Sequence, residues 1–213
     1  MQYKKSFILI AIFFANSLFS QVFKEVYENP NFDKQTQNHK KVAILPFTVI
    51  LADKALPEGI TTEELNAQQE DEGRSYQSSV FARFLKKSKN YTVSFQDISR
   101  TNTLMKKIEI AYSELDMYTK DEIAKILEVD SVISGQIHRD KPMSGGAAVA
   151  LAVFTGFGGA TNKAKLYLTI HDGANGDLLW SFNHQAAGGL GSDVESVVKR
   201  LMKKVARNFP YKK

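Results

Sequence analysis

The chain has 213 residues and not one cysteine. This absence excludes disulfides, thiolate metal sites and a cysteine nucleophile. We also expect no lipid anchor of the bacterial lipoprotein type, because that anchor is attached to an N-terminal cysteine. The Gly-x-Ser-x-Gly elbow of serine hydrolases is absent, and so is the Gly-Lys-Ser/Thr ending of phosphate-binding loops. The signatures of several enzyme classes are therefore missing.

Histidines are few and are spread along the chain. The four are His39, His138, His171 and His184, with no His-x-x-x-His or His-Glu pair. Zinc needs three or four converging ligands, and only His138 and His171, with Asp172 beside the latter, fall on strands that we expect to pair. Residues 172–177 are rich in side-chain oxygen but are too short for an EF-hand loop and lack its closing glutamate. We therefore predict no metal and no cofactor, and a plain hairpin turn at 172–176.

Charge is ordinary in amount, with 24% charged residues and a formal net charge of +5. One expected helix carries a basic face, made by Lys199, Arg200, Lys203, Lys204 and Arg207. Such a face can bind nucleic acid or anionic lipid, but a solvated helix face is also charged. We take the second interpretation and expect no nucleic acid partner.

The first twenty residues resemble a signal peptide. Lys4 and Lys5 precede an apolar run over 7–15, and small residues follow, with cleavage predicted after Ser17 or Ser20. An uncleaved membrane anchor is the rival interpretation, but the apolar run is shorter than the ~20 residues of a spanning helix. We expect an exported protein of the periplasm or outer membrane. Residues 21–39 are polar and are predicted to be a loosely attached lead-in.

Residues 40–211 have the pattern of one α/β domain. The order is strand, helix, strand, two helices, strand, insert, hairpin and a C-terminal helix. This order predicts a layered single domain with a mixed sheet of about five strands and helices packed on it. The strands are expected at 40–51, 91–96, 132–137, 166–171 and 177–182. Pro46 should weaken pairing in the first strand, and Trp180 should lie in the core.

Three stretches carry a family resemblance: residues 41–47 (KVAILPF), 124–136 (AKILEVDSVISGQ) and 168–180 (LTIHDGANGDLLW). In order and spacing they resemble the periplasmic α/β domain of the curli secretion channel lipoprotein and of the lipoprotein activators of penicillin-binding proteins. A similar domain begins the β-propeller protein of the Tol-Pal system. The resemblance covers residues 40–208 and implies an α/β fold in the cell envelope. The chain departs from the group in having no lipidation cysteine and no long membrane-spanning hairpins.

An uncharged insert, residues 142–162, separates two of the expected strands. Its centre, 147–154 (AAVALAVF), is flanked by glycines and is too short to span a bilayer as a helix. Three interpretations remain open: a short buried helix, an apolar tip that enters a membrane or a partner's groove, and an interface in a homo-oligomer. The residues predicted to make partner or membrane contact are Ala147, Ala148, Val149, Leu151, Val153, Phe154 and Phe157.

These features together predict an exported, non-enzymatic envelope protein. It would scaffold, activate or assemble other envelope components through the insert, with an envelope protein, a membrane surface or a second copy as partner. The alternative is a small periplasmic hydrolase, which would require His138, His171 and a carboxylate to converge in a cleft.

Overall fold

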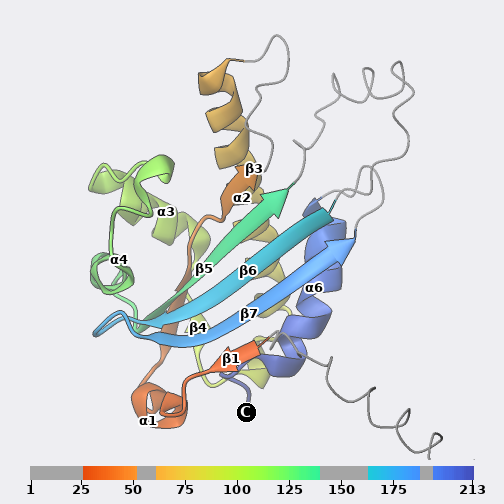
Figure 1. The fold of residues 1–213 in the computed structure, drawn as a ribbon. Helices are drawn as coiled ribbons and strands as arrows, with labels where there is room; N and C mark the ends of the chain where they lie inside the picture. The colour runs from red at the N-terminus through yellow and green to blue at the C-terminus, as the bar shows by residue number, and fades with distance from the viewer. Residues whose placement is uncertain (1–25, 52–60, 140–162, 188–193) are drawn as a thin grey trace, which may run out of the picture.

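The computed structural model describes residues 26–51, 61–139, 163–187 and 194–213 (Figure 1). The predicted signal peptide and the insert 142–162 lie outside these residues. The described residues form a single mixed α/β domain, as predicted, built on a seven-stranded sheet. Its strands are β1 (Val26–Glu28), β2 (Lys41–Ile44), β3 (Thr48–Leu51), β4 (Ser94–Phe95), β5 (Ser131–Arg139), β6 (Lys163–Asp172) and β7 (Leu178–Ala187). Its main helices are α1 (Phe32–Thr36), α2 (Thr62–Leu85), α3 (Ile98–Lys107), α4 (Lys120–Leu127) and α6 (Val194–Asn208).

The sheet has the order β1-β7-β6-β5-β2-β4, with β3 also beside β5. The pairs β4–β2, β2–β5 and β3–β5 are parallel, whereas the pairs β5–β6, β6–β7 and β7–β1 are antiparallel. Two features raise the strand number above the predicted five. The segment before residue 40 adds β1, and the long first strand is divided in two.

That division lies at Pro46, where the sequence predicted weaker pairing. β2 pairs with the start of β5 and β3 with its end, both in parallel. Pro46 has no N–H to donate. The next amide, that of Phe47, turns away from the sheet and donates to the carbonyl of Gly73 in α2 at 3.1 Å. The break therefore couples the middle of the sheet to the longest helix.

Both faces of β2 are buried, which explains its continuous apolar sequence. Val42 and Ile44 belong to a core with α2, α6 and the antiparallel strands. Ala43 and Leu45 belong to a second core with α3 and α4. Trp180 is fully buried in the first core, as predicted.

The two helix layers cover the sheet unequally. α2 and α6 lie behind β5, β6 and β7, whereas α3 and α4 pack near β2 and the first half of β5 (Figure 1). In the part of the chain that the structure describes, no helix covers the front of β6 and β7. One region of the sheet is therefore left open, and we refer to it as the open sheet face.

The segment before residue 40 is not a loosely attached lead-in, so this prediction is wrong for residues 26–39. β1 pairs with β7, with Val26 opposite Phe182. Phe32 is 4% exposed and packs edge-on against Tyr211, with ring centroids 5.1 Å apart. Residues 26–39 thus close one edge of the sheet.

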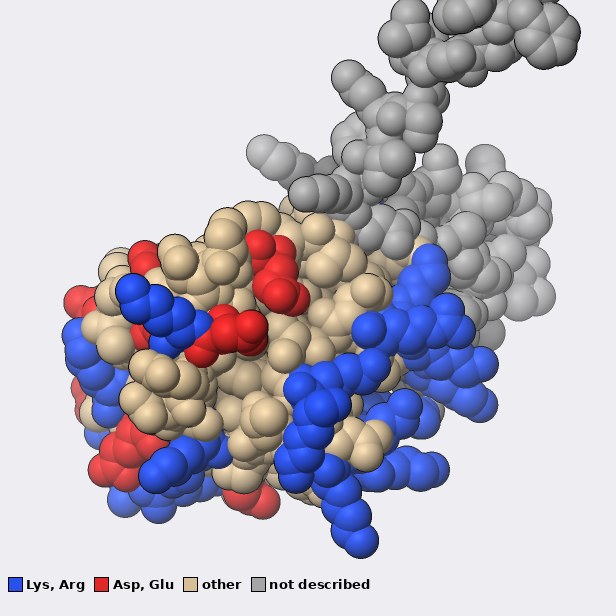
Figure 2. All heavy atoms as spheres, turned by 90° about the horizontal axis from the view of Figure 1, so that it is seen from below, with Lys and Arg blue, Asp and Glu red and all other residues tan. Residues whose placement is uncertain are grey.

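Charged side chains are not evenly distributed over the surface. Figure 2 shows the molecule from below, with a continuous group of Lys and Arg along one side and a mixture of acidic and basic side chains over the rest of this face. Among the described residues, no helix is both long and apolar enough to cross a membrane.

Candidate functional site

The open sheet face is made by alternate residues of three long strands. Because side chains alternate along a strand, burial of Leu166, Leu168 and Ile170 in the core turns the other side chains of β6 outward. The outward set includes Thr48, Ile50, Ser134, Gln136, His138, Lys165, Tyr167, Thr169, His171, Ser181 and Asn183. Apart from Lys165, none carries a fixed charge.

Part of this face forms a hollow of about 380 Å³. The hollow lies between the strands and a wall that includes Pro46, Leu115 and Lys120. Its floor consists of hydroxyl, amide, imidazole and phenol groups, which donate and accept hydrogen bonds without a strong preference for anions or cations. A surface of this composition suits a polar, largely uncharged partner.

Two polar atoms in the hollow are buried without a hydrogen-bond partner among the described residues: Oγ of Ser134 and Nδ1 of His171. Most buried polar groups are hydrogen-bonded, and leaving one unpaired costs about 1–3 kcal/mol. Burial, and secondly the charge of Lys120, lowers the pKa of His171. The ring is therefore neutral at pH 7 and has one donor and one acceptor nitrogen to offer.

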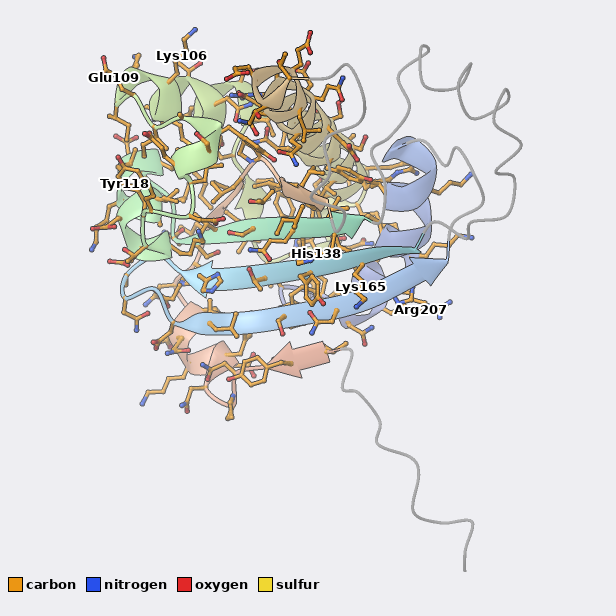
Figure 3. The ribbon with its side chains drawn as sticks, turned by 45° about the horizontal axis from the view of Figure 1, so that its top comes forward. Lys106, Glu109, Tyr118, His138, Lys165 and Arg207 are labelled. Atoms are coloured by element: carbon orange, nitrogen blue, oxygen red, sulfur yellow. The ribbon has the colours of Figure 1, made fainter. Side chains whose placement is uncertain are left out.

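The far end of the open sheet face carries an aromatic pair. His138 and Tyr167 meet edge to face with ring centroids 5.0 Å apart, and Lys165 lies beside them (Figure 3). At the same end Arg139 pairs with Ala164, the last register pair before the insert. The described residues on either side of the insert, Arg139 and Lys163, therefore lie at the edge of this face.

The insert residues that sequence analysis selected for contact lie outside the described residues. They are Ala147, Ala148, Val149, Leu151, Val153, Phe154 and Phe157. Their role stays a prediction.

The histidines do not converge. His138 is opposite Lys165, and His171 is opposite Val132 six residues away along β5. No three His, Asp or Glu side chains among the described residues are grouped to hold a metal ion. The arrangement that the hydrolase alternative requires is not formed.

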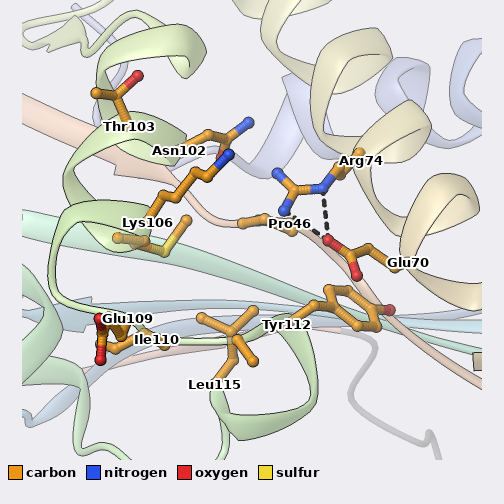
Figure 4. A pocket seen from close by; sticks show the side chains of 12 residues that line it. Pro46, Glu70, Arg74, Asn102, Thr103, Lys106, Glu109, Ile110, Tyr112 and Leu115 are labelled. Carbon is orange, nitrogen blue, oxygen red and sulfur yellow. Dashed lines mark hydrogen bonds and ion pairs between the residues drawn. The ribbon is translucent and has the colours of Figure 1, made fainter. Parts of the chain in front are cut away.

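A second hollow, of about 570 Å³, lies between α2 and α3 (Figure 4). Glu70 and Arg74 face it from α2 and pair with each other at 2.6 Å. Asn102 and Lys106 face it from α3. Among the described residues that line this cleft, no nucleophile is paired with a base. Tyr112, which also lines it, has a structural role.

Tyr112 holds the break between β2 and β3 in place. Its hydroxyl donates to the carbonyl of Phe47 at 2.6 Å and accepts from the amide of Val49 at 3.0 Å. Burial raises the pKa of Tyr112 to about 12. The phenol therefore remains protonated and able to donate at neutral pH.

A buried polar cluster joins the two ends of the described chain. His39 Nδ1 and the Tyr211 hydroxyl are 2.7 Å apart, and that hydroxyl donates to Ser131 Oγ at 3.0 Å. His39 Nε2 is 3.7 Å from Asp172 Oδ2. Burial lowers the pKa of His39, against the opposing charges of Asp172 and Asp130. The cluster has the residue types of a proton relay, but it is enclosed within the domain. Its hydrogen bonds connect β5 to both ends of the described chain.

Sequence analysis missed this cluster and the open sheet face. The cluster joins residues 172 positions apart, for which one sequence holds no signal. The open sheet face did have a signal, namely the alternation of polar and apolar residues over 165–171. That alternation predicts one exposed side for β6.

Comparisons with known proteins place the chain in no sequence family. No family model matches the sequence. No curated protein matches it either.

Several solved structures are similar in fold. Lipoprotein GNA1162 from Neisseria meningitidis is 10% identical with a TM-score of 0.45, and the match covers 79% of this chain and 95% of that one. The PelC dodecamer from Paraburkholderia phytofirmans is 13% identical with a TM-score of 0.44, covering 88% and 96%. The LpoB C-terminal domain from Escherichia coli is 9% identical with a TM-score of 0.34, covering 75% and 94%. At these values the resemblance is one of general architecture and assigns no function.

Proposed function

We propose that this chain is an exported, non-enzymatic envelope protein that scaffolds, activates or assembles other envelope components. It binds its partner through the open sheet face, together with the insert that leaves the sheet at the edge of that face. The signal peptide predicted over residues 1–20 supports export. The separation of the histidines supports binding over hydrolysis.

The observation that carries the proposal is the presence of unpaired buried polar atoms on the open sheet face. Among the described residues, Ser134 and His171 have buried polar atoms without hydrogen-bond partners, in a hollow whose strand floor is mostly uncharged hydrogen-bonding groups and whose wall adds apolar residues and the charged pair Asp116 and Lys120. A partner that supplies a donor and an acceptor there gains about 0.5–1.5 kcal/mol for each bond formed. Binding would satisfy groups that folding alone leaves unpaired.

Site-specific photo-crosslinking in the native envelope tests this face. A photoreactive residue replaces Asn183, which is exposed on β7 within the hollow, and the matched control replaces Ser78, which is exposed on the outer side of α2. Mass spectrometry of the adducts should identify a partner at Asn183 and none at Ser78. Equal adducts at both positions, or adducts at neither, would contradict the proposal.

The insert requires a separate test. Deleting residues 145–159 should weaken capture of the crosslinked partner or the membrane association of the protein. A second variant replaces the same residues by a Gly/Ser linker of equal length. It removes the apolar side chains but keeps the length of the connection, and should weaken binding as the deletion does. If both variants fold and neither changes pull-down or membrane fractionation, the insert is not a contact surface.

Export itself is tested by N-terminal sequencing of the purified protein. A start near Gln21 supports cleavage after Ser20, and one near Leu18 supports cleavage after Ser17. An intact Met1 would refute the signal peptide.

A further inference from the structure

Basic residues are concentrated in two segments that contain no acidic residue at all. Residues 73–96 hold five Lys or Arg, and residues 196–213 hold seven. The whole chain has 28 basic and 23 acidic residues. The other 171 residues therefore hold 16 basic and 23 acidic residues, a formal charge of −7 against +12 for the two segments.

The fold brings these two segments together, although 99 residues separate them in the sequence. α2 packs against α6, and Phe84 lies 4.6 Å from Phe209 between ring centroids. The Thr92 amide donates to the Tyr211 carbonyl at 2.9 Å, and the amide of Lys213 donates to the Asn90 carbonyl at 3.0 Å. The concentration of positive charge in these two segments on one part of the surface is thus a product of tertiary structure.

A groove of about 190 Å³ runs between the two segments, and we name it the basic groove. Its lining is Arg83, Lys86, Lys87, Tyr91, Lys199, Met202, Lys203 and Ala206. Met202 and Tyr91 are buried and form an apolar floor, being 6% and 4% exposed. The four lysines of the lining are exposed, so the positive groups stand at the rim.

These four lysines make no ion pair with any carboxylate among the described residues. Elsewhere on the described surface, cations such as Arg74, Arg100 and Lys125 do have carboxylate partners. Gathering like charges without counterions opposes folding through mutual repulsion. An anionic ligand that arrives at the groove removes that repulsion.

We propose that the basic groove binds headgroup phosphates of an anionic membrane surface. Flexible lysines around a shallow, exposed groove suit several mobile phosphates better than one enclosed anion, because lysine acts as a point charge without fixed geometry. Each basic residue near an anionic lipid surface strengthens binding about fivefold. The choice of lipid over nucleic acid rests on the proposed export of the protein.

Vesicle flotation with the purified protein tests this inference. The protein should bind vesicles of equal parts phosphatidylglycerol and phosphatidylcholine, and should not bind pure phosphatidylcholine. Replacing Lys199 and Lys203 by glutamine should weaken binding about 25-fold, the product of two fivefold losses. Raising the salt concentration should weaken the binding of the unmodified protein as well.

The matched control replaces Lys34 and Lys107 by glutamine, which changes the net charge equally. Both are exposed and lie on α1 and α3, outside the groove. This variant should bind as the unmodified protein does. Equal binding to pure phosphatidylcholine, or equal loss in both variants, would overturn the inference.

Two competitors separate the sources of phosphate. Glycerol phosphate should not displace the protein from vesicles at concentrations equal to the lipid phosphate, and displacement would assign the groove to a small soluble phosphate instead. Duplex DNA should bind more weakly than the vesicles, and stronger binding would overturn the choice of lipid. Crosslinking at Asn183 tests the open sheet face independently, so a failure here leaves the proposed function standing.

Discussion

Replacing Gly135 by alanine tests how tightly the central strand packs against Phe47. An added Cβ at Gly135 would overlap the Phe47 ring at Cδ1 and Cε1. The ring is fully buried and stacks on Tyr76 with centroids 5.9 Å apart. It therefore has no free space into which it can move.

The expected cost follows from these contacts. Overpacking a filled core costs about 1–3 kcal/mol, while alanine in place of glycine recovers about 0.4–1 kcal/mol by restricting the unfolded chain. The Gly135→Ala protein should therefore lose about 1–2 kcal/mol of unfolding free energy. Phe47→Leu alone should lose about 1–2 kcal/mol through the space it leaves.

The double variant decides whether the two positions act through one contact. Leucine at 47 makes room for the new methyl group, so the double variant should be more stable than the sum of the single losses predicts, by about 1 kcal/mol or more. Urea unfolding followed by the fluorescence of Trp180, the single tryptophan and fully buried, measures all three. Ser134→Ala on the open side of the same strand should not lower stability, because the hydroxyl that it removes is buried without a partner among the described residues. Losses that add within about 0.5 kcal/mol would refute the packing argument.

Three further predictions concern the other parts of the fold. Tyr112→Phe should cost about 1–3 kcal/mol, because it leaves a buried carbonyl and a buried amide at the strand break unpaired; an unchanged urea midpoint would contradict this. Phe32→Ala should cost about 3 kcal/mol by the same assay if residues 26–39 belong to the domain, and a loose segment would show no loss. Burial lowers the pKa values of His39 and His171 from 6.5. Below pH 6.5 the unfolded chain therefore binds more protons than the folded chain, and the free energy of unfolding should decrease as the pH falls. Unfolding midpoints measured across this pH range should decrease less in the His39→Gln and His171→Gln proteins, and an identical pH dependence would count against the assignment.

Local signals in the sequence predicted the elements of the fold well. The sequence has the capping-box pattern at Thr61 to Glu64 and at Thr119 to Glu122, and in the structure each glutamate accepts a hydrogen bond from the backbone amide of its threonine. The interruption at Pro46 follows from its missing N–H. Features that depend on one turn of helix or one strand are encoded within a few residues.

The same local signals could not predict contacts between residues that are far apart in the sequence. β1 is only three residues long, and its pairing with β7 joins positions more than 150 apart. Gly73 lies within a continuous α2, where an added Cβ would meet the Phe47 carbonyl. The reason for that glycine exists only after β3 and α2 have packed together.

The open sheet face and the basic groove lie on opposite sides of the same sheet, since α2 and α6 separate them. A protein whose positive side is drawn to a negative bilayer arrives with a fixed orientation. The hollow with Ser134 and His171 would then point away from the lipid and toward the aqueous space. Both surfaces can be occupied at once. The domain would then hold a partner at a fixed distance from the membrane and in a fixed orientation, while it diffuses laterally along the bilayer.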